Sequence, residues 1–178
     1  MENIGPLVEI ITQIFQTELA AYDYQFIFAD NKSTDGTREW IVEHAKTDKH
    51  IKAIFNSTNL RPGSGLNLIR RSEGDCVIFL AADLQDPPEL IPQFVRAWEE
   101  GHKIVIGVKT KSEENFIMFA MRGLFYKVLK AISETPQIEQ FTGFGLYDRE
   151  WMEFVRTIKD PAVYMRGVIA KYGFERKE

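Results

Sequence analysis

Two short acidic segments contain the side chains whose types and spacing could support chemistry. The first spans residues 29–37 and combines Asp30, Asn31 and Asp35 with a glycine. These short polar side chains precede the start of a predicted helix, where they could hold ribose hydroxyls or the edge of a nucleobase. The same residues also fit an ordinary capped turn between a strand and a helix. The pattern alone leaves both interpretations open.

The second segment, residues 80–89, places a carboxylate and a side-chain amide directly after an apolar run. Asp83 and Gln85 are two residues apart, so in an extended conformation their side chains point the same way. Such oxygen ligands suit Mg²⁺ or Mn²⁺ with coordination positions left for diphosphate oxygens. A cation held there would neutralise charge on a nucleoside-diphosphate leaving group. In the alternative interpretation, Asp86 caps a helix that begins with two prolines.

The alternation of apolar segments predicts the elements that must position these side chains. Helical spacing of apolar residues predicts an amphipathic helix over residues 4–19. Clusters of β-branched and aromatic residues predict buried strands at 24–29, 51–55, 76–80 and 103–107. Helices between these strands predict an α/β fold with a mostly parallel sheet covered on both faces. Ligands of such sheets gather at the carboxyl ends of the strands, where both acidic segments fall.

Turn-forming residues indicate where the helices begin and end. Ser33 or Thr34 could cap the helix after the first acidic segment. The prolines at 87 and 88 fit the first turn of the next helix, and Gly101 fits its end. After residue 107 the pattern changes to long helices, with one short ambiguous segment at 144–147.

The composition is typical of one soluble globular domain covering residues 1–178. Apolar residues make up 44% of the chain and charged residues 27%. The formal net charge of -4, without a basic stripe, argues against a nucleic-acid partner. No stretch approaches the roughly 18–20 apolar residues of a membrane span, so we expect a cytoplasmic protein that can still contact a membrane surface. The single Cys76 excludes an internal disulfide and is expected to be a buried thiol.

Together the two segments resemble motifs of the family-two glycosyltransferases. Residues 30–37, Asp-Asn-Lys-Ser-Thr-Asp-Gly-Thr, are similar to the donor-binding turn of that family. Residues 82–89, Ala-Asp-Leu-Gln-Asp-Pro-Pro-Glu, resemble a segment of its polyprenyl-phosphate branch, which includes dolichyl-phosphate mannose synthases. Weaker markers follow at 107–109, 124–126, 143–149 and 164–167. The resemblance implies the GT-A fold, a three-layer α/β/α sandwich.

The resemblance also implies roles for individual residues. Asp30 and Asn31 would contact the base or ribose of the donor, and Asp35 would support their turn. Asp83 and Gln85 would bind Mg²⁺ or Mn²⁺ and, through the cation, the donor diphosphate; Asp83 is thereby also a catalytic candidate. Three basic residues are candidates for the acceptor phosphate or the leaving group, with a solvated helix face as the alternative: Lys109, Arg122 and Arg166. Of these, Arg166 is also a catalytic candidate.

The activity implied by the resemblance is transfer of a sugar, with inversion, from a UDP- or GDP-sugar to a polyprenyl phosphate or a cell-envelope glycan. A phosphate acceptor is already ionised at neutral pH, so little general-base catalysis is needed. The oligomeric state is left open.

The sequence departs from the family pattern at three places. Ala81 stands where the branch has an Asp. Residues 140–146 replace an Asp-containing segment of the branch, which leaves room for a glycan or another non-lipid acceptor. The sequence also opens directly on the helix at 4–19, without the apolar first strand of the family, and we expect a chain shortened at both ends. Ala81 and the missing first strand support a second hypothesis, a nucleotide-sugar-binding domain without turnover.

Overall fold

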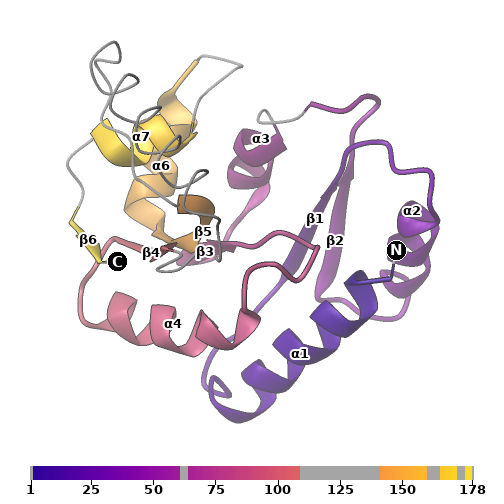
Figure 1. Ribbon diagram of the computed structural model, residues 1–178, viewed down its shortest axis with the longest axis horizontal. Helices are drawn as coiled ribbons and strands as arrows, with labels where there is room; N and C mark the ends of the chain where they lie inside the picture. The colour runs from indigo at the N-terminus through magenta and orange to yellow at the C-terminus, as the bar shows by residue number, and fades with distance from the viewer. Residues whose placement is uncertain (1, 61–63, 109–140, 160–164, 172–174, 178) are drawn as a thin grey trace, which may run out of the picture.

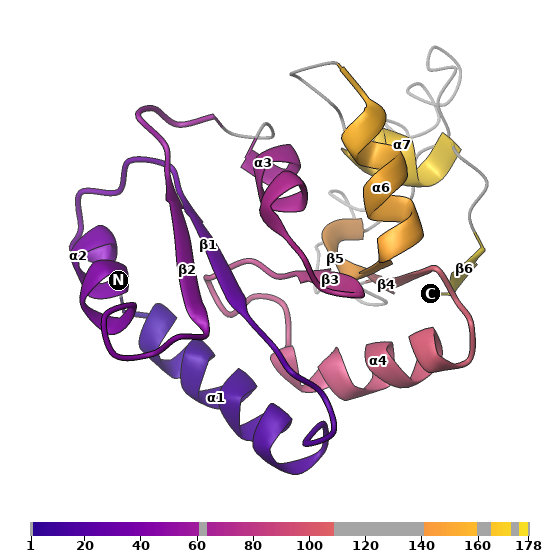
Figure 2. The ribbon, with the colours of Figure 1, turned by 180° about the vertical axis from the view of Figure 1, so that it is seen from behind.

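The structure is a computed structural model that describes residues 2–60, 64–108, 141–159, 165–171 and 175–177. Its strands form a central layer between two layers of helices (Figures 1 and 2). Helices α1 (Ile4–Thr17) and α4 (Ile91–Glu99) lie on one side of the strands. Helices α3 (Ser64–Arg71), α6 (Arg149–Thr157) and α7 (Met165–Lys171) lie on the other. The α/β sandwich expected from the sequence is therefore present.

The first part of the chain forms a parallel pair of strands. β1 (Phe26–Asp30) pairs in register with β2 (Ile51–Phe55), and α2 (Thr37–His44) connects them. The predicted cap of α2 is wrong, because the N-cap residue is Gly36 rather than Ser33 or Thr34. Gly36 has a φ of 88°, a left-handed conformation that glycine adopts without a steric penalty.

The remaining strands form a four-stranded mixed sheet in the order β3-β5-β4-β6. These strands are β3 (Cys76–Phe79), β4 (Ile104–Val108), β5 (Phe141–Asp148) and β6 (Arg176–Lys177). β5 runs antiparallel to both β3 and β4 and lies between them. The ambiguous segment at 144–147 is thus part of a central strand that runs against the common direction of β3, β4 and β6.

Both faces of the sheet around β4 and β5 are covered by packed apolar side chains. Ile104 and Ile106 point into a core shared with Trp151 and other residues of α6. Val105, between them, belongs to the core on the other face, formed with α1 and α4. This alternation follows from the two-residue period of a strand. Burying each such aliphatic side chain stabilises the fold by roughly 1.5–3 kcal/mol.

The proline-rich start of α4 was correctly located from the sequence. A short 3-10 turn, η2 (Pro88–Leu90), leads into α4, and Pro92 occupies the first turn, where no helical N–H bond is lost. The helix ends at Glu99 with Glu100 as its C-cap residue, and Gly101 follows this end as predicted. Gly101 has a φ of 104°, and its N–H donates to the carbonyl of Trp98. None of the described helices combines the length and the hydropathy that a membrane crossing requires.

Asp148 joins three elements at the end of β5. Its carboxylate accepts hydrogen bonds from the indole N–H of Trp98 at 2.7 Å and from the backbone N–H of Glu150 at 2.9 Å. The ammonium group of Lys103 lies 3.3 Å away. Burial opposes ionisation of Asp148, but these donors outweigh it and lower its pKa. α4, the start of β4 and the N-terminus of α6 are therefore held at one buried carboxylate.

Two glycine-to-alanine substitutions test the close packing at the centre of the sheet. A Cβ at Gly145 would lie 2.5 Å from the carbonyl oxygen of Val105, so Gly145→Ala forces the β4 and β5 backbones apart. We expect a loss of about 1–3 kcal/mol in the free energy of unfolding. Gly5→Ala in α1 is the matched control, because its nearest neighbour is Trp40 at 3.9 Å. In urea denaturation, the free energy of unfolding of this control should be unchanged or higher by up to about 1 kcal/mol. Equal effects at both positions would contradict the packing.

Candidate functional site

The turn after β1 is organised around the carboxylate of Asp30. Its side chain is 0% exposed and forms an ion pair with the guanidinium of Arg38 at 2.7 Å. Two nitrogens of Arg38 donate to Oδ2 of Asp30, Nη2 at 2.7 Å and Nε at 3.0 Å. The backbone N–H groups of Lys32 and Ser33 also donate to this carboxylate, at 3.2 and 3.1 Å. Four donors thus fix the turn in one conformation.

These contacts decide the charge of Asp30. Burial alone would raise the pKa of this carboxyl group, but hydrogen bonds from Ser33 and Arg38, with the positive charge of Arg38, outweigh burial and lower the pKa. Asp30 is therefore ionised at neutral pH and already committed to protein donors. In the described structure Asp30 shapes the turn, and its contact with a base or ribose stays a prediction.

Asn31 is held in place by a neighbouring strand end. The side-chain amide of Asn56, directly after β2, donates to the side-chain oxygen of Asn31 at 2.9 Å. The backbone carbonyl of Asn56 accepts from Arg38 at 3.2 Å, and the guanidinium lies 4.9 Å from the ring centre of Phe55. Arg38 and Asn56 are site residues that the sequence analysis missed. Only the position of Asn56 at the end of a predicted strand pointed to it.

Asp35 lies at the other end of the turn and is exposed. Its carboxylate accepts a hydrogen bond from the backbone N–H of Thr37, the first residue of α2, at 3.2 Å. This contact is of the supporting kind expected for Asp35. A negative side chain here also interacts favourably with the positive end of the helix dipole.

The segment after β3 is a turn rather than an extended strand. Leu84 has a φ of 59°, and the carboxylate of Asp83 accepts from the backbone N–H of Gln85 at 3.1 Å. The predicted extended alignment of Asp83 and Gln85 is therefore wrong, because the side chain of Asp83 satisfies a local backbone donor and stabilises the turn. Both side chains are exposed.

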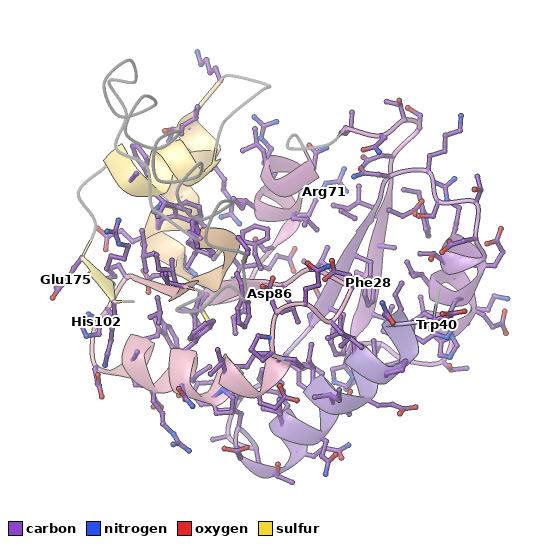
Figure 3. All side chains as sticks on the ribbon, viewed as in Figure 1. Phe28, Trp40, Arg71, Asp86, His102 and Glu175 are labelled. Carbon is purple, nitrogen blue, oxygen red and sulfur yellow. The ribbon has the colours of Figure 1, made fainter. Side chains whose placement is uncertain are left out.

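Asp86 anchors this exposed turn to the sheet. It is 5% exposed and accepts a hydrogen bond from the hydroxyl of Thr142 in β5 at 3.1 Å. Asp86 lies near the centre of the molecule in Figure 3, whereas Trp40 lies toward its periphery. The expected capping role is not observed, since Pro87 is the N-cap residue of η2 and no side-chain cap is formed.

The donor set fits a cation that is shared with a ligand better than one enclosed by protein. Among the described residues, no three His, Cys, Asp or Glu side chains gather closely enough to hold a metal ion. Mg²⁺ commonly binds through one or two carboxylates, with phosphate oxygens and water completing its coordination. Asp83 and Gln85 are exposed and provide one carboxylate and one amide oxygen, which suits such an arrangement.

The predicted basic residues are not part of the described site. Lys109 and Arg122 lie outside the described residues. Arg166 falls within α7, where its backbone is placed but its side chain is not described. Their assignment to an acceptor phosphate or a leaving group stays a prediction.

Removing Arg38 tests the electrostatic anchoring of the first turn. Arg38→Gln leaves the carboxylate of Asp30 buried and short of a counter-charge. Because Arg38 is itself about one-third exposed, breaking this pair costs less than breaking a fully buried one. We expect the free energy of unfolding at pH 7 to fall by about 1–3 kcal/mol.

The pH dependence of this loss has a definite sign. The pKa of Asp30 is lower in the folded state than in the unfolded state. The ionised carboxylate therefore contributes fully to the free energy of unfolding above the unfolded pKa of about 3.9, and this contribution is lost as the pH falls through the folded pKa. The difference between Arg38→Gln and the parent, measured by urea denaturation, should therefore shrink in acid. Lys46→Gln, which removes the exposed pair with Glu43, is the control and should change stability by less than about 1 kcal/mol.

Comparisons with known proteins place this geometry in a family. The fold resembles that of a mannosyltransferase from Pyrobaculum calidifontis in complex with GDP-Man and Mn²⁺, with a TM-score of 0.56 and 21% identity over 97% of this chain and 50% of that one. An uncharacterized glycosyltransferase of Synechocystis is 30% identical over 96% of this chain and 52% of its own length. A bactoprenol glucosyl transferase of Shigella phage SfX is 29% identical over 88% and 52%.

The chain thus spans about half the length of the curated relatives it matches. The family profile described as glycosyl transferase family 2 matches residues 3–158, which include both acidic segments and all the strands from β1 to β5. On this match the chain belongs to glycosyl transferase family 2.

Proposed function

We propose that this chain binds a nucleotide-diphosphate sugar, with UDP or GDP as the nucleotide, and transfers the sugar with inversion. The observation that carries the proposal is the exposed turn of Asp83 and Gln85, anchored beneath by Asp86, in a family 2 glycosyltransferase. One carboxylate and one amide oxygen face solvent at the end of β3. The structure of the Pyrobaculum mannosyltransferase, which is in complex with GDP-Man and Mn²⁺, supports this choice of ligands.

The two turns have different tasks in the proposed reaction. Asn31, held by Asn56, is positioned to offer its remaining polar groups to the base or ribose. Asp83 and Gln85 hold Mg²⁺ or Mn²⁺ together with the donor diphosphate. When bound, the cation supplies charge neutralisation for the departing nucleoside diphosphate. The Asp86–Thr142 hydrogen bond keeps the turn in place, so the ligands do not have to be ordered by the donor.

For the acceptor we propose a polyprenyl phosphate, with a cell-envelope glycan as the second choice. The relatives named bactoprenol glucosyl transferases support a lipid-linked acceptor. They also support placing the chain in the polyprenyl-phosphate branch of the family. With such an acceptor, the reaction would take place at the cytoplasmic face of a membrane, with Lys109, Arg122 and Arg166 as candidates for its phosphate.

A nucleotide-sugar-binding domain without turnover is the second candidate function. It is favoured by Ala81, which removes a carboxylate next to the proposed metal ligands. Binding of donor and cation without transfer would distinguish this candidate.

Replacing Asp83 tests the metal and donor assignment. Asp83→Ala removes the only carboxylate proposed as a ligand, while its exposed position lets the fold persist. We expect Mn²⁺-dependent affinity for UDP or GDP, measured by calorimetry, to fall by at least about tenfold. Glu89→Ala, an exposed carboxylate in the neighbouring η2, is the control and should leave affinity unchanged. Unaltered nucleotide binding in Asp83→Ala would exclude the metal assignment.

Transfer itself is tested with radiolabelled donors. We expect incorporation of sugar into a polyprenyl phosphate presented in detergent, supported by Mn²⁺ or Mg²⁺ and abolished by EDTA. A parallel titration with UDP and GDP identifies the base. Metal-dependent nucleotide binding without product, for either donor and with either lipid or glycan acceptors, would instead establish the binding domain without turnover.

A further inference from the structure

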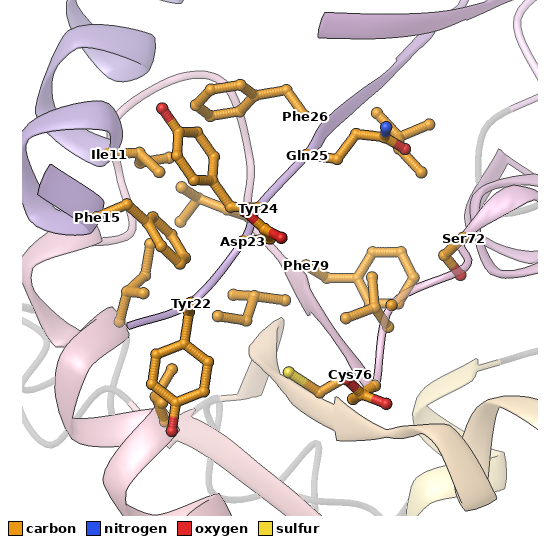
Figure 4. Close-up of a pocket in the computed structure, with 18 of the residues that line it drawn as sticks. Ile11, Phe15, Tyr22, Asp23, Tyr24, Gln25, Phe26, Ser72, Cys76 and Phe79 are labelled. Atoms are coloured by element: carbon orange, nitrogen blue, oxygen red, sulfur yellow. The ribbon is translucent and has the colours of Figure 1, made fainter. Parts of the chain in front are cut away.

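A cavity of about 660 Å³ separates the two sheets. β1 lines one wall through Phe26 and Ile27, and β3 lines the opposite wall through residues 76–79. Helices line the cavity on its other two sides, and it is partly open to solvent. Figure 4 shows Ile11 and Phe15 of α1 on one side and Ser72, which follows α3, on the other. The cavity therefore lies within the strand layer of the sandwich, between its two helical layers.

Both walls of this cavity are strand edges without a described partner. Among the described strands, β1 pairs with β2 alone, and β3 pairs with β5 alone. The other edge of each strand presents backbone N–H and C=O groups that no described strand pairs. Such groups are nearly always paired when they are buried inside a protein. The two edges thus offer two rows of donors and acceptors to whatever lies between them.

β1 and β3 are less buried than their apolar sequences predict. β1 and β3 have apolar sequences, Phe-Ile-Phe-Ala and Cys-Val-Ile-Phe, typical of strands that are fully enclosed. The sequence analysis accordingly predicted them as buried. In the structure all eight of these residues are only partly buried, whereas residues 104–106 of β4 are buried in the same molecule. What distinguishes β1 and β3 is the uncovered edge that faces the cavity.

We propose that this cavity binds one additional β-strand, an extended polypeptide segment with apolar side chains that pairs with β1 on one edge and β3 on the other. A helix, with a diameter of about 10–12 Å and its backbone bonds satisfied internally, would leave both edges unpaired. A small apolar ligand would fill the volume but also leave the backbone groups unpaired. The lengths of β1 and β3, five and four residues, set the paired segment. At about 3.3 Å per residue, it covers roughly 15 Å.

The two helical layers determine which side chains such a strand would carry on each face. Ile11 and Val95 lie on the side of α1 and α4, and Leu68 of α3 lies on the opposite side. A strand between two apolar layers reads as a continuous apolar run rather than an alternating one. The partner is therefore an extended peptide segment with four to five consecutive apolar residues. This inference is independent of the proposed function, because it involves neither nucleotide nor metal.

A labelled peptide, Lys-Lys-Val-Ile-Val-Ile-Val-Lys-Lys, tests the proposal on the whole chain. Two control peptides have the same side chains, but each carries N-methyl groups on one alternate set of backbone amides. Alternate N–H groups of a strand point to opposite edges, so each control blocks pairing with one wall of the cavity. Fluorescence anisotropy should show saturable binding of the parent peptide, at least about tenfold tighter than either control.

Hydrogen exchange locates the bound peptide. We expect slower exchange of backbone amides in both Phe26–Asp30 and Cys76–Phe79, with the amides of Ile104–Val108 unchanged as an internal reference. Equal binding of all three peptides would identify an apolar pocket instead of a strand site. Absence of binding, protection of one wall alone, or full protection of both walls before peptide is added would equally overturn the proposal.

Discussion

The pairing of β5 with strands on both of its edges is the constraint on which most of the second sheet depends. β3 and β4 are not neighbours of each other; each is held through β5. Gly145 allows the β4 backbone to approach β5 so closely that no Cβ fits between them. The two ends of β5 then extend the constraint outward. Asp148 contacts α4, the residue before β4 and the start of α6. Thr142 donates a hydrogen bond to Asp86, which anchors the exposed turn of Asp83.

The two turns of the candidate site are stabilised by different physics, and the difference suits their proposed tasks. The first is a charged network in which Asp30, Arg38 and Asn56 satisfy one another before any ligand arrives. Such a network offers little free charge, and it serves to fix backbone shape and the orientation of Asn31. The second turn has one buried anchor and keeps its carboxylate and amide in solvent. A ligand that brings its own negative charge and a cation is better accommodated by the second turn.

The sequence was sufficient for the elements whose signal is local. Apolar spacing located α1 and the strands β1 to β4, and Gly101 marked the end of α4, two residues after its last helical residue. Strand direction and neighbour order depend on distant contacts, so the central, antiparallel place of β5 could not be read from 144–147. The same holds within the site. Asp83 was found from its motif, but its folded-back conformation depends on the left-handed backbone at Leu84, and the Arg38–Asp30 pair joins residues eight apart on different elements.

The cavity between β1 and β3 connects these observations, because both turns begin where its walls end. The turn of Asp30 continues β1, and the turn of Asp83 continues β3. A strand hydrogen bonded to both walls would fix the separation of the two strand ends and hence of the two turns. Any free energy that such a strand gains by binding the folded state also stabilises that state. We therefore expect binding of the strand to be thermodynamically coupled to ordering of the candidate site. The coupling would pass through the backbones of β1 and β3 rather than through side chains of the site.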